Sequence, residues 1–324
     1  MIPPVREGDV PLTWSSGRDT RGILQVVLEN DDLRLTVLPE LGGRLWSLID
    51  LAQGAEVLWH HPTLQPHRVA PGAGYDDAFA GGWDELFPSD RAVDIDGVTF
   101  PDHGEWWSQP WTWQIDEAED ALRLTLSGSG FVTRHEAHRT VALPREGSRF
   151  TWKTRITNTG DVSIPFIWRH HPALPIRAGG RLELPPAAVE AVAEDAGAIS
   201  AAPFTWPDAV LADGTERDFS RLPDADSGEV WMLYATNLPE GSARLTWTGP
   251  HDGKEHGIAF TFDPAIVTAV TTFATFGGWR DLKTILPEVG VGYPADLQGA
   301  VAAGTSGTLA AGDSAAYGVQ VTVW

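Results

Sequence analysis

The sequence of 324 residues contains no cysteine, which removes several kinds of chemistry at once. A chain without thiols has no disulfide framework, no cysteine nucleophile and no thiolate metal site. Runs of about 20 apolar residues are also missing, and the first residues, MIPPVREGDV, do not combine a basic region with an apolar stretch. We therefore expect a cytoplasmic protein that does not bind membranes.

Positive charge is scarce as well. The chain has 23 basic and 44 acidic residues, a formal net charge of −21. A surface with this excess of negative charge repels nucleic-acid phosphates and anionic lipids. No glycine-rich loop followed by lysine and serine or threonine is present to hold a nucleotide. We expect a small-molecule ligand rather than nucleic acid.

Short segments with alternating apolar residues recur along the chain, at 33–38, 122–127, 149–157, 244–248, 257–263 and 316–323. This period of two is typical of strands that bury one face. Turn sequences such as NDD at 30–32 and NTGD at 158–161 lie close to them, which favours antiparallel neighbours. With 34 glycines and 24 prolines, long helices cannot dominate. The sequence predicts an all-β protein, a large antiparallel β-sandwich in one domain over residues 1–324.

One segment breaks this pattern. Residues 185–200, PPAAVEAVAEDAGAIS, have the alanine and glutamate content of a helix, but two prolines and a glycine make a surface loop an equal alternative.

Four other segments combine aromatic rings with ionisable groups: GGWDELFPSDR at 81–91, PDHGEWWSQPW at 101–111, PFIWRHHPALP at 165–175 and LPEVGVGYP at 286–294. A site for a polyhydroxylated ring needs apolar faces, hydrogen-bonding groups, an acid and a base. These segments supply all of them. The 15 tryptophans could also stack on sugar faces, although packing in a core explains most of them equally well.

These motifs resemble a known family. LPELGGRLWSLID at 38–50, DHGEWW at 102–107, WRHHP at 168–172 and EVGVGYP at 288–294 occur in the order seen in aldose 1-epimerases, the galactose mutarotase-like proteins. The resemblance runs from about residue 30 to the C-terminus. It implies a β-sandwich of the galactose mutarotase type, a supersandwich, and an isomerase of carbohydrate metabolism that interconverts the α and β anomers of a free aldose without a cofactor.

The resemblance also implies roles for individual residues. Glu288 corresponds to the base that removes the anomeric hydroxyl proton, although Val289 follows it where the family usually has proline. His171 corresponds to the acid that protonates the ring oxygen. His103 and Arg91 correspond to sugar-binding residues, and Trp83 and Trp106 are candidates to contact the sugar. Asp208 and Asp224 are both candidates for an aspartate that completes the site.

Histidine poses two further questions. His170 adjoins His171, and because successive strand residues face opposite sides, only one should enter the site. His135 and His138 should likewise face opposite sides of a strand and cannot chelate a metal together. His60, His61 and His67 lie in a proline-rich loop that lacks a matching carboxylate, so we expect no metal.

A second class of function fits the same features. A carbohydrate-binding or regulatory protein could keep the fold and the aromatic rings without turnover. We expect either protein to be a monomer or a homodimer.

Overall fold

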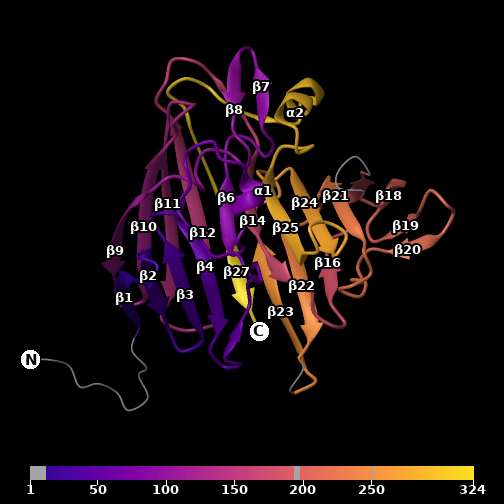
Figure 1. Ribbon diagram of the computed structural model, residues 1–324, viewed down its shortest axis with the longest axis horizontal. Coiled ribbons are helices and arrows are strands. Elements are labelled where there is room, and N and C mark those ends of the chain that lie inside the picture. The colour runs from indigo at the N-terminus through magenta and orange to yellow at the C-terminus, as the bar shows by residue number, and fades with distance from the viewer. Residues whose placement is uncertain (1–11, 193–197, 250–251) are drawn as a thin grey trace, which may run out of the picture.

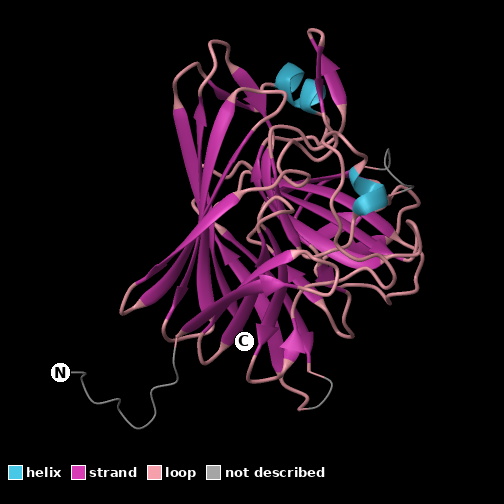
Figure 2. Cartoon of the chain, turned by 60° about the vertical axis from the view of Figure 1, so that its left-hand side comes forward, coloured by secondary structure: helices cyan, strands magenta, loops and turns pink. Residues whose placement is uncertain are grey.

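The computed structural model describes residues 12–192, 198–249 and 252–324. Two large antiparallel sheets dominate it, and Figure 2 shows them splayed apart from one another at their ends. The predicted β-sandwich is confirmed. The strands predicted at 33–38, 122–127 and 149–157 are found at Leu33–Leu38, Ala121–Ser129 and Arg149–Asn158.

Across the described residues the larger sheet has 15 strands. Its main path is β1 (Thr13–Arg18), β2 (Leu24–Glu29), β3 (Leu33–Leu38), β4 (Arg44–Asp50), β6 (Trp83–Leu86), β14 (Trp168–Pro172), β25 (Lys283–Val291), β24 (Ala269–Phe276), β21 (Val230–Thr236), β17 (Ala188–Ala191), β18 (Ala201–Thr205), β19 (Asp208–Val210) and β20 (Glu216–Asp218). Two short strands join it at the side, β5 (Ala55–Glu56) on β4 and β15 (Leu174–Pro175) on β25.

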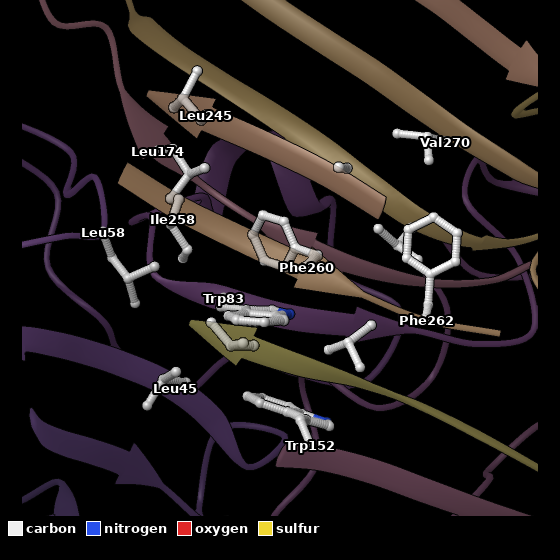
Figure 3. Packing of buried hydrophobic residues seen from close by; sticks show 14 of the residues in the cluster. Leu45, Leu58, Trp83, Trp152, Leu174, Leu245, Ile258, Phe260, Phe262 and Val270 are labelled. Carbon is white, nitrogen blue, oxygen red and sulfur yellow. The ribbon is translucent and has the colours of Figure 1, made fainter. Parts of the chain in front are cut away.

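The second sheet, with eight strands in the part of the chain that the structure describes, covers one face of the first. Its order is β16 (Arg181–Glu183), β22 (Ser242–Thr248), β23 (Glu255–Thr261), β27 (Ser314–Val323), β12 (Arg149–Asn158), β11 (His135–Pro144), β10 (Ala121–Ser129) and β9 (Thr112–Glu117). The core lies between the two sheets. Figure 3 shows Trp83 from the first sheet lying flat against Trp152 from the second, at a ring separation of 5.0 Å.

The remaining elements are small. Helix α1 (Tyr75–Ala78) is a single turn, and α2 (Leu297–Ala303) is capped by the side chain of Asp296. The hairpin of β7 (Val93–Ile95) and β8 (Val98–Phe100) packs against α2 at one end of the molecule (Figure 1). Strands β13 (Ile164–Phe166) and β26 (Gly307–Leu309) form a separate pair.

The segment at 185–200 does not form a helix where the structure describes it. Residues 188–191 are strand β17, paired with β18 and β21, and residues 193–197 lie outside the described part. Alternate burial along β17 explains the result, because Val189 and Ala191 enter the core while Ala188 and Glu190 face outward. No helix in the described residues has the length and apolar character needed to cross a membrane.

Candidate active site

Three adjacent strands bring the candidate residues together at the centre of the larger sheet. In β14 and β6, His171 pairs with Asp84, and His170 pairs with Glu85. Strand β25 lies on the other side of β14 and carries Glu288. Since side chains alternate along each strand, one set faces a pocket and the other set faces the core between the sheets.

The pocket has a volume of about 310 Å³, at the small end for ligand sites. Its lining comprises Tyr75, Asp76, Phe79, Asp90, Arg91, Asp102, His103, His171, Met232, Phe273, Trp279, Leu286, Glu288 and Ala295. The structure therefore brings together Glu288, His171, His103 and Arg91, four of the residues to which the aldose 1-epimerase resemblance pointed. A space of this size suits one sugar ring rather than a chain of sugars.

Glu288 and His171 face one another in this pocket. The Glu288 Oε1 atom lies 3.8 Å from His171 Nε2, and both side chains are buried. Arg169, two residues before His171 and on the same face of β14, forms an ion pair with Asp90 and approaches Glu288 Oε2 at 3.5 Å. The pair is therefore held between charged groups and kept from bulk water.

These surroundings shift both pKa values. Burial, reinforced by the charge of Asp90 and opposed by Arg169, raises the pKa of Glu288 to about 8. Burial also lowers the pKa of His171 well below its usual value, and the nearby positive charges of His103 and Arg169 act in the same direction. At neutral pH the proton of the pair therefore resides mainly on Glu288.

His103 lies in a turn with φ of 55°, a left-handed conformation that is uncommon outside glycine. Its backbone N–H donates to the Asp90 carbonyl at 2.7 Å, and its Nδ1 lies 2.8 Å from Asp102 Oδ1. Burial alone would lower the pKa of His103, but the hydrogen bond with Asp102 and the charges of Asp90, Asp102 and Asp76 raise it overall. The ring at the pocket wall is thus more readily protonated than an ordinary histidine.

The structure places the two predicted tryptophans elsewhere. Trp83 and Trp106 are fully buried and do not line the pocket, so the expected contact of these rings with a sugar does not match their positions. Trp83 packs between the sheets, and Trp106 stacks on Phe87 with its Nε1 donating to His135. Trp279, which sequence reasoning missed, lines the pocket instead.

The neighbouring carboxylates divide in the same way. Asp84 faces the site, whereas Glu85 lies in the core and accepts hydrogen bonds from Arg139, Trp152, Thr154 and Trp168. Asp208 and Asp224 are exposed and outside the pocket lining, where Asp76, Asp90 and Asp102 are the aspartates instead.

The other histidines behave as the strand geometry predicts. His170 is buried against Trp83, Trp152 and Tyr317, on the core side of β14. His135 is buried and His138 is exposed.

The loop histidines have separate local partners. His60 stacks on Trp46, while the His61 Nδ1 atom accepts from the backbone of Leu64 and His67 Nδ1 contacts the Gln65 carbonyl. Within the described ranges, the ligand-like cluster found is Asp76, Asp102 and His103, whose candidate atoms lie within 4.8 Å of one another.

Comparison with solved structures defines the class of fold. The Slr1438 protein from Synechocystis is 19% identical with a TM-score of 0.65, covering 97% of this chain and 99% of its own. A galactose mutarotase-like protein from Clostridium acetobutylicum is 12% identical with a TM-score of 0.66, covering 97% and 98%. Another from Lactobacillus casei is 19% identical with a TM-score of 0.61, covering 93% and 100%. The fold is that of the galactose mutarotase-like β-sandwiches.

A family can also be assigned from sequence. Residues 15–207, more than half of the chain, match the domain of unknown function DUF5107, and the chain belongs to this family. A search of curated proteins finds no match.

Proposed function

We propose that this protein is an aldose 1-epimerase that interconverts the α and β anomers of a free sugar. The observation that carries the proposal is the buried pair of Glu288 and His171, 3.8 Å apart in a pocket of single-sugar size. Ring opening requires one group to take a proton and a second group to give one, and both must be within reach of the same small ring. The similarity in fold to galactose mutarotase-like proteins supports the proposal.

In the proposed reaction Glu288 accepts the proton of the anomeric hydroxyl, and the C1–O5 bond breaks as a carbonyl forms at C1. His171 gives a proton to the ring oxygen. Rotation about C1–C2 then exposes the other face of the aldehyde. The ring oxygen attacks that face, its proton returns to His171, and Glu288 returns its proton to the new anomeric oxygen. Every atom and proton is recovered, so the cycle consumes nothing.

The two protonation states of the pair match the two stages of this cycle. With the closed sugar, the proton resides on His171 and Glu288 is ionised; with the open chain, the proton resides on Glu288. The raised pKa of Glu288 and the lowered pKa of His171 favour the second state in the empty site. The lowered pKa also makes the His171 imidazolium a stronger acid toward the weakly basic ring oxygen.

The charges around the pocket favour an uncharged substrate. His103 and Arg91 can donate hydrogen bonds to sugar oxygens, while Asp76, Asp90 and Asp102 can accept them from hydroxyls. A phosphate group would meet these three aspartates. We therefore propose a free aldose rather than a sugar phosphate.

Polarimetry of freshly dissolved sugars tests the proposal. Wild-type protein should accelerate the approach of α-glucose or α-galactose, or of another aldose in a panel, to anomeric equilibrium above the buffer rate. Glu288→Gln serves as the matched inactive protein. Saturable sugar binding without any acceleration across the panel would reject the epimerase and leave a carbohydrate-binding or regulatory protein.

A further inference from the structure

Tyr75 contacts both histidines of the candidate site. It is the first residue of the short helix α1 and is 2% exposed. Its ring stacks on His103, with centroids 3.9 Å apart and planes 8° apart, and meets the edge of His171 at 5.5 Å. Its backbone N–H donates to Asp102 Oδ2 at 2.8 Å, which fixes the start of the helix beside the pocket. No sequence motif pointed to this residue.

The Tyr75 hydroxyl lies between two polar atoms. It is 2.8 Å from Asp84 Oδ2 and 3.3 Å from His171 Nδ1. A hydroxyl has one hydrogen to give, and a carboxylate can only accept. If that hydrogen pointed at His171, the hydroxyl oxygen and Asp84 Oδ2 would face each other through lone pairs at 2.8 Å. The shorter contact therefore takes the hydrogen, and the lone pair of the hydroxyl is left for His171.

Arg44 fixes the orientation of the Asp84 carboxylate. Its Nε and Nη2 atoms donate to the two oxygens of Asp84 at 2.8 and 2.7 Å, and both side chains are buried. Such a two-pronged pair holds the carboxylate in one orientation. The direction of the Tyr75 hydrogen is consequently set from the strand β4 side, before any ligand enters the pocket.

We propose that Tyr75, held by Asp84 and Arg44, is a positioning residue that keeps neutral His171 in the tautomer with hydrogen on Nδ1. In this arrangement Nδ1–H donates to the Tyr75 hydroxyl, and the bare Nε2 is the nitrogen that faces Glu288 Oε1 at 3.8 Å. A histidine whose second nitrogen is anchored in this way has a defined ring orientation and a defined proton-exchanging atom. Only the catalytic consequence rests on the proposed function.

The consequence for the reaction is specific. Nε2 is the atom that would exchange its proton with the ring oxygen, because Nδ1 is committed to Tyr75. If the ring of His171 could flip or change tautomer, part of the population would present an N–H toward Glu288 and could not accept a proton there. Tyr75 removes that inactive population.

The ¹⁵N chemical shifts of the His171 ring, measured at pH 7.5 without substrate, test the tautomer directly. His171→Asn identifies the signals by their disappearance. In wild type we expect a protonated Nδ1 and a bare Nε2. A wild-type ring with hydrogen on Nε2 would overturn the proposal, and this measurement requires no variant of Tyr75.

Tyr75→Phe should then allow the Nε2–H tautomer to appear, whereas unchanged shifts would overturn the role of the hydroxyl. Tyr317→Phe is the matched control, since it also removes a buried hydroxyl, one near the carbonyls of Trp168 and Val289. It should leave the His171 shifts as in wild type.

The kinetic effect is a separate readout. If sugars are turned over, Tyr75→Phe should lower kcat about 3- to 10-fold, the range expected for losing one orienting hydrogen bond. Raising the sugar concentration should not restore the rate, because the loss is in kcat. If wild type turns over no sugar, the proposed function fails while the ¹⁵N measurement still decides the tautomer.

Discussion

His171 Nε2 and Glu288 Oε1 lie 3.8 Å apart, each on a neighbouring strand of one sheet and each buried. Their pKa values are displaced in opposite directions, upward for the carboxyl and downward for the imidazole. Between the two displaced pKa values the carboxyl is protonated and the imidazole is neutral, so the two groups together hold one proton.

Replacing Glu288 by glutamine tests the base. The amide keeps the shape of the side chain and can still form hydrogen bonds, but it accepts no proton. We expect turnover to fall by about 10²–10⁴-fold while sugar binding largely persists. Polarimetry and calorimetric titration measure the two effects. Glu136→Gln, an exposed position on β11, is the control. Turnover close to that of wild type would reject Glu288 as the base.

The pH dependence follows from the single shared proton. Below the lowered pKa of His171 the pair holds two protons, and above the Glu288 pKa of about 8 it holds none. Proton transfer in both directions requires one. We therefore expect kcat/KM, corrected for the buffer rate, to decrease as pH rises through about 8. A rate that increases through pH 8, as for an isolated carboxylate base, would contradict the one-proton pair.

The same shift predicts an effect on stability. Folded Glu288 has a pKa of about 8, against an ordinary value of 4.5, so between these values the folded state holds a proton that the unfolded state has lost. Wild-type stability from this group is present below pH 4.5 and decreases as pH rises through 8. Glu288→Gln lacks this loss. From pH 5 to 8 the unfolding free energy of the variant should rise relative to that of wild type by an amount on the order of a few kcal/mol, which melting temperatures at the two pH values report. An equal difference at both pH values would disprove the shift.

The strands and the division of faces could be predicted from the sequence, because both follow from a local period of two. His171 and His170 separate correctly for this reason. The roles of Trp83 and Trp106 could not be predicted. A tryptophan that packs in a core and a tryptophan that lines a sugar site can have the same neighbours in sequence. Their burial depends on the second sheet, which supplies Trp152 and His135 from distant parts of the chain.

Tyr75 shows a second limit. The partners of its hydroxyl come from β6 and β14, up to 96 residues away in sequence, and Arg44 on β4 holds one of them, Asp84. The pairing of His171 with Asp84 is a matter of strand register, and no local pattern encodes it. The place of Arg169 beside the site could be predicted from the sequence, because it is two residues from His171 and therefore on the same face of β14.

Chelation tests the cluster of Asp76, Asp102 and His103. Asp102 is already hydrogen-bonded to His103 Nδ1 at 2.8 Å, and the proposed reaction uses only proton transfer. Exhaustive treatment with a chelator should therefore leave the polarimetric rate unchanged. Loss of activity that zinc restores would show instead that a metal takes part.

The neighbouring histidines provide the sharpest comparison, because they differ in the face of one strand and in little else. His171 lines the pocket, whereas His170 is enclosed by Trp83, Trp152 and Tyr317 on the core side. Burial lowers the pKa of His170 to about 4, so the ring is neutral at working pH.

His171→Asn should reduce mutarotation by about 10²–10⁴-fold, as expected for the loss of a positioned proton donor. His170→Asn should lower the melting temperature through lost packing but retain most of the rate per folded molecule. Circular dichroism gives the folded fraction by which each rate is divided. The reverse ranking of the two variants would show that the acid has been assigned to the wrong histidine.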